Sequence, residues 1–128
     1  MWTGSAIFGI EMHGSYRNIR VIGTNEQTLI TTFSDKNIIL GDWQTGQLIR
    51  TLTGHSSYIT SAVISSDKLF LVSGSVDKTI TTWNFRTGQE LCTLTGHSFP
   101  TTSLTLSLDG QLLVSGSSDG TVKVWGLP

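Results

Sequence analysis

Short apolar runs alternate with clusters of small and polar residues along the whole chain. Residues 69–73 form an apolar run of strand length, residues 74–78 are small or turn-forming, and residues 79–83 are rich in β-branched and aromatic side chains. This length, composition and punctuation are typical of β-strands joined by tight turns. The pattern therefore predicts a strand, a turn at residues 74–78 in which Asp77 accepts hydrogen bonds, and a second strand.

This unit returns with a constant period, marked by a histidine and, 22 positions later, an aspartate. The pairs, in chain order, are His13 with Asp35, His55 with Asp77, and His97 with Asp119. Successive pairs are 42 positions apart, and we call this spacing the repeat period. A fixed period of this size indicates stacked units that bury their apolar faces against one another.

The period divides the single predicted domain, residues 1–128, into four segments. Residues 13–54, 55–96 and 97–128 are three repeats, and residues 1–12 match the fourth-strand end of a repeat. The last repeat lacks that fourth strand. The predicted strands are residues 16–22, 28–32, 37–41 and 48–52 in the first repeat, 58–64, 69–73, 79–83 and 90–94 in the second, and 101–107, 112–115 and 121–125 in the third.

A Gly-His pair, then Ser-Gly-Ser-x-Asp, then a Trp six residues after the Asp resembles the WD40 repeat, and the resemblance extends over the whole chain. It implies an all-β propeller of four-stranded blades. It also implies a hydrogen-bonded tetrad of His, Ser or Thr, Asp and Trp in each repeat. Those positions are His55, Ser73, Asp77 and Trp83, then His97, Ser115, Asp119 and Trp125, and in the first repeat His13, Thr31 and Asp35, where Gly41 stands at the Trp position.

Three repeats are too few for a closed ring, because propellers typically have about 4–8 blades. The strand missing from the third repeat is the one left over at the N-terminus. We therefore expect a homodimer that forms a six-bladed ring by strand exchange, with a nine-bladed trimer or a fragment of a longer propeller as alternatives. The pairing segments would be Ala6, Ile7, Phe8, Gly9 and Ile10 of one copy and Thr121, Val122, Lys123, Val124 and Trp125 of the next.

In WD40 proteins, the loops before the innermost strands line the top face. The positions here are Tyr16, Arg17, Tyr58 and Phe99. Exposed aromatic residues beside an arginine are common protein-binding anchors. An alternative is that Tyr16 and Tyr58 only cap their blades. The resemblance thus implies a non-enzymatic scaffold for an unidentified protein or peptide; the alternative is a structural assembly unit without a dedicated ligand.

Composition narrows the partners. The formal net charge is −1, and the eight Lys and Arg residues are scattered, so neither nucleic acid nor an anionic membrane is an expected partner. The one cysteine, Cys92, excludes a disulfide within the chain and is predicted to be a buried, inert thiol. The first ten residues do not resemble a signal peptide, and the apolar runs are too short to span a membrane. A cytoplasmic location is expected.

The recurring histidines and aspartates also allow a metal or catalytic interpretation. Zinc ligands cluster at short spacing, whereas these histidines occur once per repeat. Catalytic carboxylates need a partner across a cleft, whereas these aspartates occur once per equivalent turn. The glycine-rich segments do not match a phosphate-binding loop. The sequence therefore predicts no metal site, no cofactor and no catalytic residue.

Overall fold

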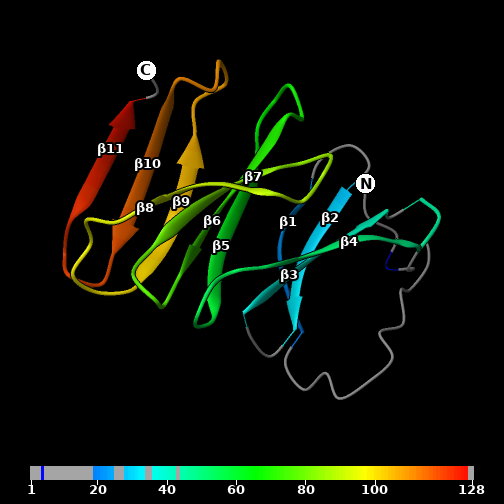
Figure 1. The fold of residues 1–128 in the computed structure, drawn as a ribbon, viewed down its shortest axis with the longest axis horizontal. Coiled ribbons are helices and arrows are strands. Elements are labelled where there is room, and N and C mark those ends of the chain that lie inside the picture. Colours follow the sequence, from blue (N-terminus) through cyan, green and yellow to red (C-terminus); the bar gives the residue numbers. More distant parts are fainter. Residues whose placement is uncertain (1–3, 5–18, 25–27, 34–35, 43, 127–128) are drawn as a thin grey trace.

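The computed structural model describes Gly4 and residues 19–24, 28–33, 36–42 and 44–126. Within these residues the fold is entirely β, with three antiparallel sheets and no helix, which confirms the predicted fold class at this level. Figure 1 shows the sheets following one another along the long axis of the molecule. In the described part of the chain, no helix is long and apolar enough to cross a bilayer.

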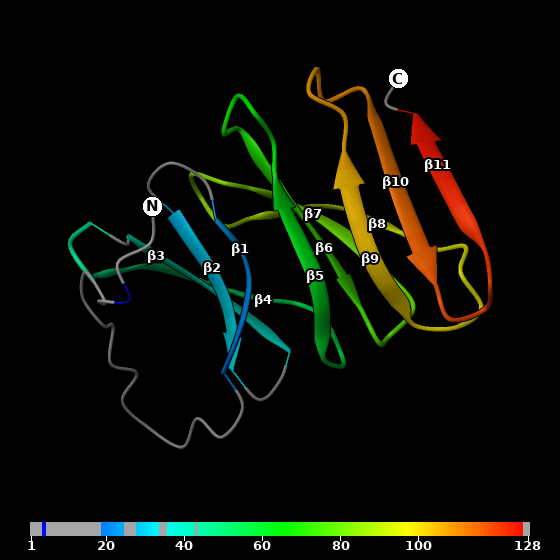
Figure 2. The ribbon, with the colours of Figure 1, turned by 180° about the vertical axis from the view of Figure 1, so that it is seen from behind.

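Each sheet is a meander in which neighbours in the chain are neighbours in the sheet. Sheet 1 consists of β1 (Ile19–Thr24), β2 (Thr28–Phe33), β3 (Asn37–Asp42) and β4 (Leu48–Thr53). Sheet 2 consists of β5 (Ile59–Ile64), β6 (Phe70–Ser75), β7 (Ile80–Asn84) and β8 (Glu90–Leu94). Sheet 3 consists of β9 (Thr101–Leu106), β10 (Leu112–Ser117) and β11 (Val122–Gly126). The first strands of the sheets lie side by side, with β5 between β1 and β9 (Figure 2).

The core lies between the sheets. Because successive strand residues point to opposite faces, Leu71 faces sheet 1 and Val72 faces sheet 3. The first cluster contains Ile30, Ile38, Leu40 and Leu52 from sheet 1 with Ile59, Ala62, Leu71 and Trp83 from sheet 2. In the second cluster, buried Val72 and Ile80 from sheet 2 meet Leu113 from sheet 3. Each such aliphatic side chain stabilises the stack by about 1.5–3 kcal/mol when fully buried.

The turn after β6 is shorter than predicted, because Gly74 and Ser75 belong to the strand. The Ser75 amide donates to the Thr79 carbonyl, and the Lys78 amide donates to the Ser75 carbonyl, with Lys78 at a φ of 76°. Gly74 is needed for packing instead. A Cβ on Gly74 would lie 2.8 Å from Cγ2 of Thr101 in sheet 3. The glycine therefore lets two sheets approach closely.

The first strand of sheet 1 also differs from the prediction, because β1 spans Ile19–Thr24 rather than residues 16–22. Its pairing register shifts between Val21 and Gly23, whereas the corresponding shift in β5 lies between Ile59 and Ser61. Glycine in a strand commonly accompanies a bulge, since it tolerates the local bend. The strand is also offset from the repeat period, because Thr24 pairs with Leu29 five positions later, whereas Ile64 pairs with Leu71 seven positions later.

Cys92 is exposed, so the prediction of a buried thiol is wrong. It lies in β8, the last strand of sheet 2, where both Leu91 and Thr93 are also exposed. A last strand has a neighbour on one side only, and β8 lies at the outer end of its sheet. Its position in the repeat therefore did not imply burial.

Several predicted residues lie outside the described residues. They are Ala6, Ile7, Phe8, Gly9, Ile10, His13, Tyr16, Arg17 and Asp35. The proposed exchange of residues 6–10 between copies thus remains a prediction.

Candidate functional site

Four side chains of the second repeat, from sheet 2 and the segments beside its strands, form one hydrogen-bonded network. Nδ1 of His55 lies 2.9 Å from Oδ2 of Asp77, and Nε2 lies 2.7 Å from Oγ of Ser73. The indole N–H of Trp83 donates to the same Ser73 oxygen at 2.8 Å. His55, Ser73 and Trp83 are buried. The residues come from the segment before β5, from β6, from the following turn and from β7.

The chemistry of these groups fixes the direction of the hydrogen bonds. An ionised carboxylate only accepts, so the Nδ1–H of His55 donates to Asp77. In the tautomer that carries this one ring proton, Nε2 accepts from the Ser73 hydroxyl, while Ser73 accepts from the Trp83 indole. Each buried polar group in this chain of hydrogen bonds has a partner, which is the condition for burying polar side chains without a large penalty.

Asp77 also organises its own turn. Its Oδ1 accepts from the amide of Thr79 at 2.8 Å and from the Thr79 hydroxyl, and its Oδ2 accepts from the amide of Ser56 at 3.0 Å. Partial burial acts to raise the pKa of Asp77, but the hydrogen bonds from Thr79, His55 and Ser56 outweigh it and lower this pKa below its ordinary value. The carboxylate therefore stays charged and joins the turn to the segment before β5.

The third repeat contains the same arrangement with one longer contact. Nε2 of His97 lies 2.7 Å from Oγ of Ser115, which accepts from the Trp125 indole at 2.9 Å. Nδ1 of His97, however, lies 3.5 Å from Oδ2 of Asp119. The Thr121 hydroxyl is the main cause of a pKa of Asp119 well below its ordinary value, and backbone amides lower it further. The carboxylate here is held mainly by its own turn.

The sequence pattern missed the threonine of this network. The hydroxyl of Thr79 lies 3.3 Å from Nδ1 of His55, and that of Thr121 lies 3.2 Å from Nδ1 of His97. A signal was present, since both threonines occur two positions after the turn aspartate, one repeat period apart. The first repeat has Asn37 at that position.

The glycines before His55 and His97 have a packing role that the sequence analysis did not assign. A Cβ on Gly54 would lie 2.7 Å from Cη2 of Trp83, and one on Gly96 would lie 3.0 Å from Cη2 of Trp125. The indole ring thus packs directly on the glycine backbone. This contact explains why the tetrad tryptophan is preceded, 29 positions earlier, by a residue without a side chain.

Only part of the first-repeat site is described. The Thr31 hydroxyl lies 3.5 Å from the carbonyl of Ile39, and the equivalent Ser73 hydroxyl lies 3.5 Å from the carbonyl of Thr81. Gly41 is buried in β3 at the tryptophan position. His13 and Asp35 lie outside the described residues, so the tetrad positions of this repeat stay a prediction.

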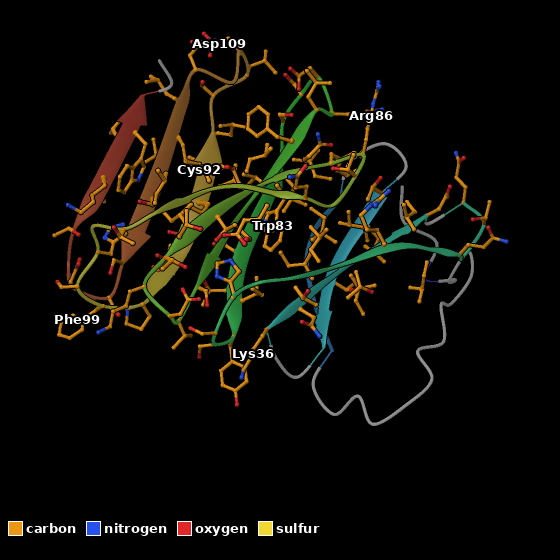
Figure 3. All side chains as sticks on the ribbon, viewed as in Figure 1. Lys36, Trp83, Arg86, Cys92, Phe99 and Asp109 are labelled. Carbon is orange, nitrogen blue, oxygen red and sulfur yellow. The ribbon has the colours of Figure 1, made fainter. Side chains whose placement is uncertain are left out.

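The loops before β5 and β9 present aromatic side chains at one edge of the sheets, which we call the top face and define by Tyr58, Phe99 and the turns at Asp77 and Asp119. Tyr58 is 57% exposed and Phe99 is 54% exposed. In Figure 3, Phe99 and Lys36 lie at this edge, and Arg86 and Asp109 lie at the opposite one.

The backbone beneath these aromatic residues is held by serine hydroxyls. Oγ of Ser75 lies 2.7 Å from the carbonyl oxygen of Tyr58, and Oγ of Ser117 lies 3.1 Å from that of Phe99. The amide of Val76 adds a hydrogen bond to the Tyr58 carbonyl at 2.9 Å. The loops are thus tied to the ends of β6 and β10. This arrangement presents two exposed aromatic side chains on a fixed backbone.

In each network, the polar residues are hydrogen-bonded to other residues of the same repeat. His55 and His97 each use both ring nitrogens inside their own repeat. Among the described residues, no three His, Cys, Asp or Glu side chains come together as a metal-binding group. The networks are therefore suited to fixing the turns of the top face.

A comparison with protein-family models agrees with this geometry. The model described as "WD domain, G-beta repeat" matches residues 46–84 and 88–126, which together make up more than half of the chain. The matched segments include Ser73, Asp77 and Trp83 and their counterparts in the third repeat. No curated protein matches the chain. On the strength of the family match and the repeated tetrad geometry, the chain belongs to the WD40 repeat family.

Proposed function

We propose that this chain is a non-enzymatic scaffold that binds a protein or peptide partner through its top face. The observation that carries the proposal is the exposure of Tyr58 and Phe99, 57% and 54%, on loops whose carbonyls accept hydrogen bonds from the ends of neighbouring strands. Large aromatic side chains on a fixed backbone lose little conformational freedom on binding, and such residues dominate protein-binding surfaces.

The tetrads support a scaffold rather than an enzyme. A general acid or base must reach a substrate proton, at hydrogen-bonding distance or through one water. His55 and His97 are buried and hydrogen-bonded on both ring nitrogens, and Asp77 and Asp119 accept from the backbone of their turns. These groups hold the loops that carry the aromatic residues.

The test is a binding comparison of matched variants. Tyr58→Ala/Phe99→Ala removes the two exposed aromatic side chains among the described residues of the top face, and Leu91→Ala/Leu108→Ala removes two exposed leucines elsewhere. Each pair is used as bait in extract from the source cells. We expect a partner that binds wild type and the leucine variant but is lost from the aromatic variant. A partner retained by the aromatic variant and lost from the leucine variant contradicts the proposal.

Self-assembly is the second part of the proposal. Two copies would form a ring of six sheets, in which residues 6–10 of one copy pair with β11 of the next; three copies would form nine. Support comes from β11, where Val122 and Val124 are exposed and where no described strand pairs with the outer edge. Light scattering gives the mass directly, and a folded monomer would contradict this part. An assembly that binds nothing through its top face would leave a purely structural role.

A further inference from the structure

The side of sheet 3 that faces away from sheet 2 is apolar, and no residue in the described part of the chain covers it. We call it the rear face and define it by Leu112, Val114, Val122 and Val124. Val122 is 71% exposed, Val124 64% and Leu112 47%. These residues alternate with Leu113 and Trp125, which pack against sheet 2. Contiguous apolar surface of this kind is typical of an interaction site.

The same positions are covered in the other two sheets. In sheet 2, Val72 and Ile80 stand one repeat period before Val114 and Val122, and each is 1% exposed because sheet 3 covers it. In sheet 1, the corresponding Ile30 and Ile38 are covered by sheet 2. In both contacts within the chain, a rear face is therefore covered by the next sheet along the chain, which turns its opposite face toward it.

Two contacts fix the position of the covering sheet. Cγ2 of Thr101, the first residue of β9, lies against Gly74, where an added Cβ would be only 2.8 Å away. The hydroxyl of Thr60, at the register shift of β5, donates to the carbonyl of Thr101 at 2.5 Å. Thr101 is thus held at two points, by the space beside Gly74, which we call the glycine socket, and by the hydroxyl of Thr60.

Sheet 3 has its own copy of both features. Gly116 stands one repeat period after Gly74, and the side-chain atoms near its missing Cβ belong to Ser103 and Thr102 of the same sheet. Thr102 stands at the register shift of β9, as Thr60 does in β5, and it is exposed. Among the described residues, none occupies the Gly116 socket from outside sheet 3.

We propose that the rear face of sheet 3 binds sheet 1 of a second copy of this chain, with Ile19 at Gly116 in the position that Thr101 takes at Gly74. The proposal rests on the self-assembly proposed above. It adds the register of the contact.

The pairing register selects Ile19. It pairs with Phe33, as Ile59 pairs with Ser75 and Thr101 with Ser117. Each of these partners stands one repeat period from the next, so Ile19 is the β1 residue equivalent to Thr101.

The next β1 residue on the same side of the strand is also apolar, like its equivalents in the two observed contacts. Val21 pairs with Thr31, as Ala62 pairs with Ser73 and Leu104 with Ser115. Sheet 1 therefore has β-branched residues at both register positions that meet a rear face in the two observed contacts. A sheet face of four strands covers roughly 400 Å². Each contact buries one such face on each copy, and a two-copy ring contains the contact twice. The total buried area therefore lies in the range of stable interfaces.

An engineered disulfide tests this register. The ideal Cβ on Gly74 lies 3.3 Å from Cβ of Thr101, within a few tenths of an ångström of disulfide geometry. Gly74→Cys/Thr101→Cys is therefore the positive control and should form a bond within one chain. The test variant is Ile19→Cys/Gly116→Cys. Both are made with Cys92→Ser, since Cys92 is exposed. Leu108→Cys in the same background measures random cross-linking, because Leu108 is 85% exposed and lies in the turn between β9 and β10, outside the proposed contact.

After mild oxidation, we expect the test variant to run on a non-reducing gel as a covalent dimer, while Leu108→Cys stays monomeric. A covalent trimer also supports the contact and indicates nine sheets. If the positive control forms its bond, wild type has the mass of a dimer and the test variant stays monomeric, the contact is wrong although assembly is right. A monomeric wild type together with a monomeric test variant overturns both proposals.

Discussion

Nδ1 of His55 lies 2.9 Å from Oδ2 of Asp77, although 22 positions separate the two residues in the chain. The equivalent atoms of His97 and Asp119 are 3.5 Å apart. The longer contact occurs in sheet 3, which has a neighbouring sheet on one side only among the described residues. The same substitution should therefore have a larger effect in the second repeat than in the third.

Removing the second-repeat carboxylate tests this difference. In Asp77→Ala the Nδ1–H of buried His55 loses its acceptor, so we expect unfolding to become easier by about 1–3 kcal/mol. Urea unfolding followed by circular dichroism measures the change. Asp119→Ala should shift the midpoint less, and Asp67→Ala, in the exposed turn before β6, provides the control. An Asp77→Ala midpoint equal to that of wild type would contradict the role of this pair.

The shared serine gives a second prediction. Because Ser73 is hydrogen-bonded to both Trp83 and His55, Ser73→Ala and Trp83→Phe remove parts of one network. Their effects on unfolding should be non-additive, with a coupling of about 0.5–3 kcal/mol. The matched control combines Ser73→Ala with Trp125→Phe, which belongs to the other network and should give additive effects. Equal coupling in the two double variants would show that the serine does not link these groups.

The glycine before the histidine gives a third prediction. Gly54→Ala places a methyl group 2.7 Å from the Trp83 ring, so we expect a loss of about 1–3 kcal/mol from overpacking. Gly96→Ala, with 3.0 Å to Trp125, should cost less. Gly126→Ala is the control, since nothing lies within 4 Å of its added Cβ. Thermal melts of the three variants rank these effects, and an unchanged Gly54→Ala melt would argue against the contact.

Acid should weaken the fold through its aspartates. The pKa values of Asp77 and Asp119 are lower in the folded chain than the ordinary value of about 4. Their contribution is therefore fully present above about pH 4 and is lost as pH falls below it, because the unfolded chain binds protons first. Melting temperatures recorded from pH 7 to pH 2 should fall in this window. The decline should be shallower in Asp77→Asn/Asp119→Asn; equal slopes in wild type and variant would contradict the assignment.

The sequence predicted the repeated elements well because their signals are local. The β-branched and aromatic residues of 79–83 and the aspartate at 77 favour a strand and a turn without reference to the rest of the chain. The period then showed that His55, Ser73 and Trp83 recur one repeat later as His97, Ser115 and Trp125. The structure brings the first three side chains within hydrogen-bonding distance.

The sequence was misleading where neighbouring sheets decide the outcome. Gly74 lies in a segment whose composition is typical of a turn. Its role is nevertheless set by Thr101, which is 27 positions away and in another sheet. Cys92 has the spacing of a buried residue but lies on a last strand. The offset of β1 follows from the connection to β2, where Thr24 pairs with Leu29 five positions on, whereas Ile64 pairs with Leu71 seven positions on in sheet 2; the period does not specify this length. Contacts between sheets carry no local signal, so periodicity alone could not supply them.

Sheet 2 lies between two neighbours, whereas sheet 3 has one among the described residues, and this asymmetry has a kinetic consequence. In a stacked array, the opening of each unit depends on its own stability and on the contacts with adjacent units. In a single copy, backbone amides of β9 and β10 should therefore exchange their hydrogens with deuterated water sooner than those of β5 and β6. Occupation of the outer side of sheet 3 would slow that exchange, so the protection pattern along the chain would report whether the end of the stack is covered.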